Sequence, residues 1–388
     1  MYEHRKSTKQ VFLQDESGAP LKNAKVSVDL KKHEFLFGCG AFDFLKIEDG
    51  DPYIDKKTAE WQELFNYGTL PFYLGQFEPV EGQPETASRM LAAKYLKAHG
   101  VTTKGHPLCW HELCADWLMD YDDATVLDKV IKRVERDVTA FKGVIDMWDV
   151  INEAVHMPKF YLYDNAITRI CKKYGRVKLI KEVFDAAHTA NPDAKLLIND
   201  FTLSESYDIL IDGCLNAGIP ISAIGLQTHQ QKGYRGDEYF QEVVERFSSF
   251  GLPLHFTENT LISGELMPEH IFYLTQWKVD SWPSTPEFEE RQKNELEKMY
   301  RMMFDAPSVE ALTNWNFEDG AWLKAPGGFV HEDLTKKPSF EMLDKLINKE
   351  WHTAYETVTD DNGFFTLEGF KGTYEISANG SVFAETLK

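Results

Sequence analysis

Short apolar runs alternate along the chain with longer segments in which apolar residues recur every three or four positions. The short runs are typical of buried strands, and the longer segments of amphipathic helices. Strands are expected at 33–42, 68–74, 101–110, 144–153, 195–201, 223–229, 252–259 and 311–317. Helices are expected at 85–99, 123–141, 165–190, 236–250, 286–304 and 338–349. Repeated strand-then-helix units predict an α/β fold, a parallel (β/α)8 TIM barrel. An open doubly wound sheet is the alternative, and the lack of a Gly-rich phosphate loop weakens it.

The two ends of the chain have a different pattern. Residues 11–30 and 355–378 alternate apolar and polar positions and contain turn residues. The stretches DESGAPLKNAKVSV and TDDNGFFTLEGFKGTY resemble carboxypeptidase-regulatory-like β-sandwich modules. We therefore expect a barrel at 33–350 and one small all-β sandwich built from 1–32 plus 351–388. Two unrelated hairpins lying on the barrel are the alternative.

Most of the expected strands end in polar or aromatic side chains. These are His106 and Trp110, Asn152 and Glu153, Asn199 and Asp200, Gln227 and His229, Glu258 and Asn259, and Trp315. In a β/α barrel the carboxyl ends of the strands form the active-site face. One polar strand end could cap the helix that comes next, but six together predict a functional site.

Two glutamates at these strand ends suggest a specific chemistry. Glu153 and Glu258 end the fourth and seventh expected strands, and paired carboxylates across a cleft hydrolyse glycosidic bonds. One must be protonated to protonate the leaving oxygen. The other must be ionised to attack the anomeric carbon or to activate water. Asn152 is expected to hydrogen-bond the sugar hydroxyl next to the reacting carbon, and His229 to hydrogen-bond Glu258.

Aromatic side chains near the same strand ends fit a sugar as the ligand. The C–H faces of sugars pack on flat rings, so Trp110, Trp315 and Trp322 are expected to line the cleft. As isolated residues they would more often belong to a hydrophobic core. The remaining tryptophans are interpreted as core or surface packing.

No catalytic metal and no cofactor are expected. His106 and His111 are five positions apart, which matches no recognised zinc spacing. His255 and Glu258 are three apart in a strand, so they should face opposite sides.

Six stretches, taken together, resemble glycoside hydrolase family 10, the endo-1,4-β-xylanases. They are GHPLCWH (105–111), WDVINEA (148–154), LLINDF (196–201), IGLQTH (224–229), HFTEN (255–259) and TNWNFEDGAWL (313–323). The resemblance implies a retaining, endo-acting hydrolase of β-1,4-xylosidic bonds in xylan or xylo-oligosaccharides. It implies Glu153 as general acid/base and Glu258 as nucleophile. It also implies that the sugar is held by His106, Trp110, Asn152, Gln227, His229, Trp315 and Trp322.

Two departures from the family pattern bear on specificity. A Glu-Asn-x-Met-Lys-Trp stretch is usual after the second strand, but this chain has TLPFYL, which places Thr69, Leu70 and Tyr73 at the polar positions. A polar clamp thus becomes apolar and aromatic, and Phe72 or Tyr73 is expected to stack on a sugar. Thr260 replaces an Asp that commonly supports the histidine corresponding to His229, which predicts weaker support of His229 and lower activity.

Net charge limits the classes of partner, and the cysteines and the first residues bear on the cellular compartment. With 62 acidic against 42 basic residues the net charge is −20, which disfavours nucleic acid and anionic membranes. Five cysteines without a CxxC pair favour reduced thiols. The first residues, MYEHRKSTKQ, lack the apolar core of a secretion signal. We expect a cytoplasmic protein if the natural chain starts here, and a secreted or periplasmic one if a signal was removed.

Two other functions remain as alternatives. The same barrel could act on another or a decorated β-glycan, which the TLPFYL stretch favours. It could instead be a non-catalytic glycan-binding protein. Retention of both glutamates argues for catalysis.

Overall fold

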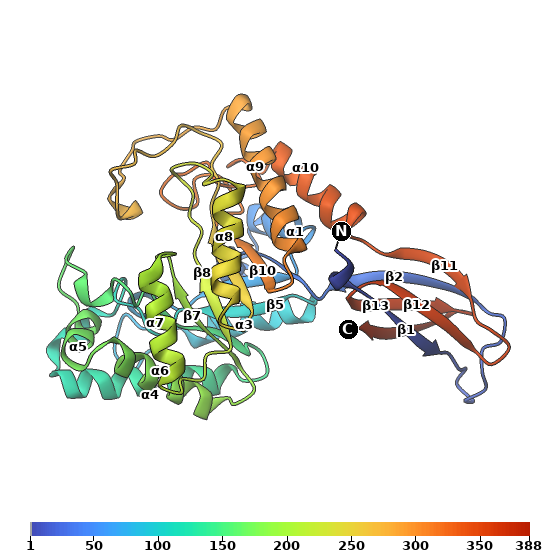
Figure 1. Cartoon of the computed structure of the whole chain (residues 1–388), viewed down its shortest axis with the longest axis horizontal. Helices are drawn as coiled ribbons and strands as arrows, with labels where there is room; N and C mark the ends of the chain where they lie inside the picture. The colour runs from blue at the N-terminus through green and yellow to red at the C-terminus, as the bar shows by residue number, and fades with distance from the viewer. Residues whose placement is uncertain (1) are drawn as a thin grey trace.

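The computed structural model describes residues 2–388. Parallel strands close into a barrel in the order β10-β3-β4-β5-β6-β7-β8-β9 (Figure 1). The strands are β3 (Leu36–Gly40), β4 (Tyr67–Pro71), β5 (Thr102–His106), β6 (Met147–Asn152), β7 (Lys195–Asp200), β8 (Ala223–Leu226), β9 (Leu254–Asn259) and β10 (Val309–Asn314). Each overlaps one of the eight strands expected from the sequence, so the TIM-barrel prediction is confirmed.

The helices lie around the outside of this barrel. They are α1 (Pro52–Gln62), α2 (Leu74–Phe77), α3 (Thr86–Ala98), α4 (Asp123–Phe141), α5 (Ala166–Tyr174), α6 (Arg176–Ala190), α7 (Glu205–Asn216), α8 (Asp237–Ser248), α9 (Pro286–Asp305) and α10 (Pro338–Lys345). The single helix expected at 165–190 is wrong in one respect. It is split at Gly175, whose φ of 87° is outside the helical region and favours glycine.

The helix α4 shows how sequence produces this layer. Asp122 caps its first turn by accepting a hydrogen bond from the backbone N–H of Thr125 at 2.8 Å. Val126, Val130 and Val134 recur every four residues and are buried against the barrel. Within residues 2–388, no helix is both long enough and apolar enough to span a bilayer.

The barrel wall needs a glycine where β5 meets β6. A Cβ on Gly105 would lie 2.1 Å from the ring of Trp148, which fills that space instead. Gly105 and Trp148 are register partners across the two strands. The close approach holds in place the strand that leads to Asn152 and Glu153.

The terminal segments form two antiparallel sheets. Their strands are β1 (Lys6–Phe12), β2 (Lys25–His33), β11 (Ala354–Val358), β12 (Phe364–Phe370), β13 (Gly372–Ala378) and β14 (Ser381–Leu387). One sheet is β1-β12 and the other is β11-β2-β13-β14, so strands from both ends of the chain pair with each other. This pairing does not fit two separate hairpins. The domain boundaries, 33–350 for the barrel and 1–32 plus 351–388 for the sandwich, stay a prediction.

The sandwich lies at the end of the barrel where β3 begins, because β2 leads directly into β3 (Figure 1). Arg5 joins the two parts. Its guanidinium donates hydrogen bonds to the backbone carbonyls of Phe304 (2.9 Å), Ala306 (2.7 Å) and Val309 (2.6 Å). It also lies 4.8 Å from the ring centroid of Phe35. The carboxyl ends of the barrel strands remain free on the other side.

We predict that Arg5→Met destabilises the protein by about 2–4 kcal/mol in urea denaturation. Three partly buried carbonyls would lose a charged donor, and one such hydrogen bond contributes about 1.5–3 kcal/mol. The net loss is smaller than the sum of three, because the variant is also relieved of the cost of burying the Arg5 guanidinium. The matched control is Lys9→Met, because Lys9 is exposed and its one ion pair within residues 2–388 is with Glu385 of the same sandwich. Equal unfolding midpoints for the two variants would show that Arg5 does not hold the sandwich to the barrel.

Candidate active site

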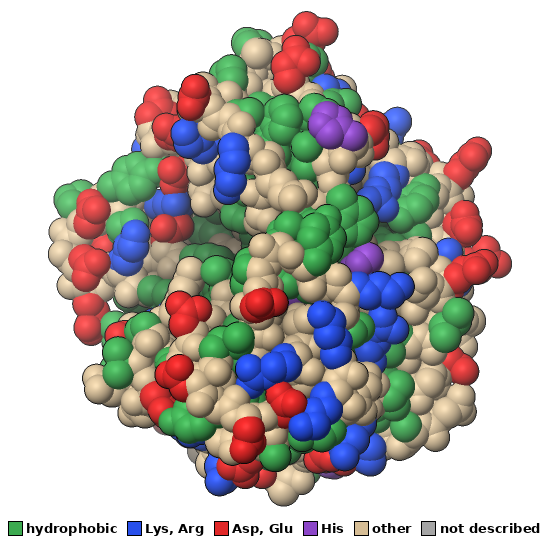
Figure 2. All heavy atoms as spheres, turned by 90° about the vertical axis from the view of Figure 1, so that its left-hand side faces the viewer, with side chains coloured by type: hydrophobic (Ala, Val, Ile, Leu, Met, Phe, Trp, Pro, Cys, Tyr) green, Lys and Arg blue, Asp and Glu red, His purple; other side chains and the backbone are tan. Residues whose placement is uncertain are grey.

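A large cleft opens at the carboxyl ends of the barrel strands. Its volume is about 1180 Å³. Figure 2 shows the molecule from the side turned away from the sandwich, where the surface is hollowed. All ten site residues expected from the sequence line it: Tyr73, His106, Trp110, Asn152, Glu153, Gln227, His229, Glu258, Trp315 and Trp322.

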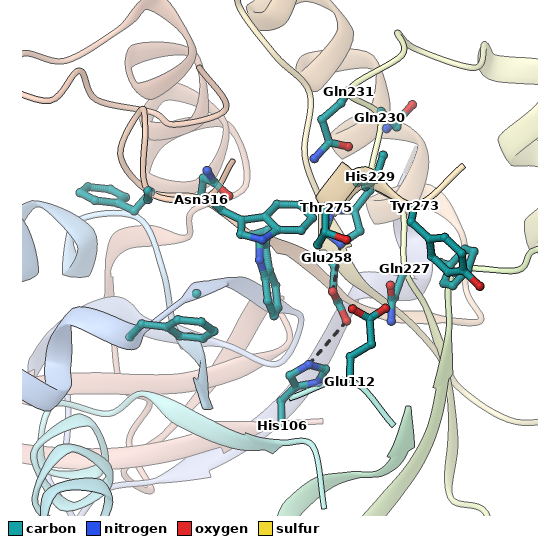
Figure 3. A pocket seen from close by; sticks show the side chains of 18 of the residues that line it. His106, Glu112, Gln227, His229, Gln230, Gln231, Glu258, Tyr273, Thr275 and Asn316 are labelled. Carbon is teal, nitrogen blue, oxygen red and sulfur yellow. Dashed lines mark hydrogen bonds and ion pairs between the residues drawn. The ribbon is translucent and has the colours of Figure 1, made fainter. Parts of the chain in front are cut away.

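Glu258 lies near the end of β9 and is 4% exposed. Its Oε1 accepts a hydrogen bond from Asn199 Nδ2 at 2.9 Å, and its Oε2 lies 3.0 Å from His229 Nε2. His106 Nε2 lies 3.9 Å from Oε1, the contact drawn as a dashed line in Figure 3. Burial alone would raise the pKa of Glu258. The hydrogen bond with His229 and the charges of His106 and Lys104 outweigh burial and hold that pKa below its ordinary value.

Glu153 comes directly after β6 and is 8% exposed, with its backbone in the left-handed region at a φ of 57°. Trp110 Nε1 donates to its Oε2 at 2.9 Å, and Gln227 Nε2 lies 3.3 Å from its Oε1. Burial raises the pKa of Glu153 well above its ordinary value, and the nearby carboxylates of Glu112 and Glu258 raise it further. The hydrogen bond from Trp110 opposes this shift without cancelling it. The pKa values of the two glutamates are therefore shifted in opposite directions.

Side-chain amides connect the two carboxylates. Asn199 Nδ2 donates to Asn152 Oδ1 at 2.8 Å as well as to Glu258. Asn152 Oδ1 also accepts from Gln227 Nε2 at 2.9 Å, and Asn152 Nδ2 lies 3.4 Å from Glu153 Oε1. These amides come from the ends of adjacent strands, so the barrel itself sets how the carboxylates face each other.

A buried ion pair orients His106. Its Nδ1 lies 2.7 Å from Asp149 Oδ2, and the same oxygen lies 2.7 Å from Lys104 Nζ. Lys104 and Asp149 are both fully buried. Because Nδ1 is engaged with Asp149, Nε2 is the atom directed to Glu258.

His229 is held differently. Its Nδ1 lies 3.1 Å from Thr260 Oγ1, so a neutral hydroxyl takes the position where the family pattern has an Asp. The expectation of lower activity stays a prediction.

Aromatic rings surround the two glutamates. Trp315 packs edge-on against Phe42 and His106, each with ring centroids 5.4 Å apart, and Trp322 lies 4.8 Å from His229. Tyr73 lies 5.5 Å from Trp110. These rings supply flat apolar surfaces beside the reacting position.

The TLPFYL stretch contributes less to the cleft than expected. Thr69 and Leu70 are fully buried in β4 and do not line the cleft. Phe72, expected as one of two candidate stacking residues, is in the core, 4.9 Å from Trp148 and 5.1 Å from Phe141. The chain turns after β4, and only Tyr73 of this group faces the cleft.

Several lining residues were missed from the sequence. The lining residues Glu112, Phe272 and Tyr273 lie in loops outside every expected element. Phe42, Phe201 and Asn316 lie at or next to the ends of expected strands but have no role assigned from the sequence. Figure 3 shows Glu112 and Tyr273 in the cleft with Glu258. Asn199 does not line the cleft itself, but it hydrogen-bonds both Asn152 and Glu258 from a strand end, and the sequence assigns it no role.

The two pairs considered from the sequence as metal ligands, His106 with His111 and His255 with Glu258, do not share partners. His106 Nδ1 contacts Asp149, which is not among the neighbours of His111. His255 Nε2 lies 3.3 Å from Glu310 Oε2, away from the partners of Glu258, so the two do not share a ligand. His111 lies beside Glu112 and Glu153, and one ligand atom from each of the three lies within 4.8 Å of the others.

Comparison with known proteins places this site in a family. The model of "Glycosyl hydrolase family 10" matches residues 75–345. Anti-sigma-I factor RsgI6 of Acetivibrio thermocellus is 26% identical over 97% of this chain, which spans 45% of that protein. Endo-1,4-beta-xylanase B of Thermotoga neapolitana is 26% identical, over 71% of this chain and 75% of its own length.

A solved structure agrees at the level of the fold. Xylanase 10B of Thermotoga petrophila, in complex with xylobiose, superposes with a TM-score of 0.66 at 21% identity. The match covers 82% of this chain and 95% of that one. The family model covers most of the chain and includes both strand ends that carry the glutamates. The chain therefore belongs to glycosyl hydrolase family 10.

Proposed function

We propose that the protein is a retaining, endo-acting glycoside hydrolase that cleaves β-1,4-xylosidic bonds in xylan or xylo-oligosaccharides. One observation carries the proposal: two buried glutamates face one cleft, joined through Asn152 and Asn199, and each has a different set of hydrogen-bond partners. Paired carboxylates of this kind are the machinery of glycoside hydrolysis.

In the first step Glu258 acts as nucleophile. Its ionised carboxylate attacks the anomeric carbon while Glu153 gives its proton to the departing glycosidic oxygen. The bond to the leaving sugar breaks, and a covalent glycosyl-enzyme ester forms on Glu258. The lowered pKa of Glu258 and the raised pKa of Glu153 suit these roles.

In the second step Glu153, now ionised, takes a proton from water. The water oxygen bonds to the anomeric carbon, the ester to Glu258 breaks, and both glutamates regain their starting states. Two displacements at one carbon retain its configuration. Asn152 and His106 remain at the sugar throughout, because their partners fix them in the protein.

The choice of xylan rests on relatives. Thermotoga neapolitana endo-1,4-beta-xylanase B is named for that activity, and the family assignment points the same way. The cleft is lined by neutral amides and aromatic rings near the glutamates, as an uncharged sugar chain requires. We propose no nucleic-acid or membrane partner, in keeping with the net charge of −20.

A binding role without turnover is the second candidate. The relative matched over 97% of this chain is named an anti-sigma-I factor, not an enzyme. In this case the cleft would hold a glycan that is never cleaved. Loss of the clamp residues at Thr69 and Leu70 also keeps another or a decorated β-glycan as an alternative ligand.

The first test measures products from xylohexaose, arabinoxylan and a β-glucan, with wild type beside Glu258→Ala. We expect wild type to release short xylo-oligosaccharides and Glu258→Ala to lose at least about 10⁴-fold in rate, because no nucleophile remains. NMR of the first product should show the β-anomer.

Glu153→Ala is the paired variant in the same assay. It should lose activity on xylohexaose yet retain much of its first step on a dinitrophenyl β-xylobioside, whose leaving group needs no proton. Tight binding of xylohexaose without products, in wild type as in Glu258→Ala, would instead establish the binding role. Cleavage of the glucan alone would contradict xylan as substrate.

The pH dependence of kcat/KM should show whether His229 lowers the pKa of Glu258. In His229→Phe the ring remains but its hydrogen bond to Glu258 is lost, so the pKa of Glu258 rises. Because Glu258 must be ionised to attack, the acidic limb of the profile should move to higher pH. The rate at the optimum should fall by about 10–100-fold, the effect of a hydrogen bond to a charged group.

His156→Phe is the control for this variant. His156 lies at the edge of the same region and stacks on Phe201, with ring centroids 5.0 Å apart. Within residues 2–388, the side chain of His156 makes no hydrogen bond to Glu153 or Glu258. The acidic limb of the His156→Phe profile should therefore match that of wild type. An unshifted acidic limb in His229→Phe would contradict the role given to His229.

A further inference from the structure

Three side chains beside the proposed proton donor form a group that the hydrolytic mechanism does not use. His111, Glu112 and Glu153 each offer one ligand atom, and these atoms lie within 4.8 Å of one another. Within residues 2–388 this is the one place where three such groups come so close. Glu112 reaches the cleft from the loop after β5 (Figure 3).

His111 is the unusual member of this group. It is 0% exposed, and neither ring nitrogen has a hydrogen-bond partner among residues 2–388. Its ring packs edge-on against Phe160, with centroids 4.6 Å apart. An apolar ring on that side offers the imidazole nitrogens no hydrogen-bond partner. Buried polar atoms nearly always have a partner, because leaving one unpaired costs about 1–3 kcal/mol.

The neighbours of His111 supply what a cation needs. Two carboxylates, those of Glu112 and Glu153, converge on the same space as the imidazole. A bound cation would give the imidazole nitrogen a partner and would offset the repulsion between the carboxylates. The opening toward the cleft leaves room for water in the remaining positions.

The donor set selects the kind of ion. One imidazole nitrogen with two carboxylate oxygens suits Zn²⁺ and similar transition metals, which bind three protein ligands and keep a position open. Ca²⁺ and Mg²⁺ prefer oxygen ligands alone. Zn²⁺ takes such ligands at ~2.0–2.2 Å, so the three atoms, now within 4.8 Å of one another, would close in around the ion on binding.

We propose that His111, Glu112 and Glu153 form a binding site for Zn²⁺ or a similar transition-metal ion, and that the bound ion inhibits hydrolysis. Inhibition is expected because a carboxylate that ligates a metal cannot carry the proton for the leaving oxygen. The inhibitory part rests on the proposed function of Glu153, whereas the binding part stands without it.

Binding is tested by titrating chelator-treated full-length protein with Zn²⁺ in a calorimeter. We expect one strong site in wild type and at least a tenfold weaker affinity in both His111→Leu and Glu112→Gln. The second variant keeps the shape of an accessible side chain, so it remains informative if His111→Leu folds poorly. His188→Leu, which removes an exposed histidine on α6, should bind as wild type does.

Wild-type affinity in both His111→Leu and Glu112→Gln, or no strong site in wild type, would overturn the binding proposal. Co²⁺ offers a second readout, since its visible absorption should intensify on entering a site of low coordination number and should be weak in Glu112→Gln.

Inhibition is tested by xylohexaose hydrolysis over the same Zn²⁺ range. Activity should fall along the binding curve, recover with EDTA, and need at least tenfold more Zn²⁺ to fall in Glu112→Gln. Strong binding with undiminished hydrolysis would overturn the inhibitory part of the proposal, because an ion ligated by Glu153 must block its proton transfer. If the protein hydrolyses nothing, calorimetry alone still decides whether the site exists.

Discussion

The burial of two carboxylates in one cavity is the constraint on which the rest of the site depends. A buried carboxylate without partners is costly, and two of them also repel each other. Here the partners differ: Glu258 faces Asn199 and His229, whereas Glu153 receives one strong hydrogen bond from Trp110. The hydrogen bond with His229 lowers the pKa of Glu258, whereas burial and the charges of Glu112 and Glu258 raise the pKa of Glu153 against the hydrogen bond from Trp110. The proposed division of labour in hydrolysis rests on this difference in surroundings.

The closed barrel makes that difference possible. Its parallel strands bring Asn152, Asn199 and Gln227 to neighbouring strand ends, where their amides hold each other as well as the carboxylates. The sandwich formed by both chain termini is attached at the other end, through Arg5 and β2, so it does not cover the cleft. The part of the molecule that differs most from a plain barrel thus leaves the cleft uncovered.

The sequence predicted the strands and the residues at their ends because both signals are local. An apolar run that stops at Asn152-Glu153 can be recognised in the sequence without knowledge of the tertiary structure. The direction that the chain takes after a strand cannot be predicted from such a local pattern. Phe72 and Tyr73 are chemically alike, and only the turn after β4 sends one into the core and the other into the cleft. Glu112 was missed because its loop has no periodic pattern, and the break at Gly175 because the apolar spacing continues across it.

The central claim is that Glu258 forms a covalent bond to the sugar while Glu153 handles the proton. Incubation with a dinitrophenyl 2-deoxy-2-fluoro-β-xylobioside, with mass spectrometry of proteolytic peptides as the readout, tests it directly. The fluorine slows both displacements, and the dinitrophenolate leaving group keeps the first fast enough for the ester to accumulate. The account predicts a mass increase of one fluoroxylobiosyl group on the peptide containing Glu258. A label on Glu153 instead, or hydrolysis with inversion and no label on either glutamate, would contradict it.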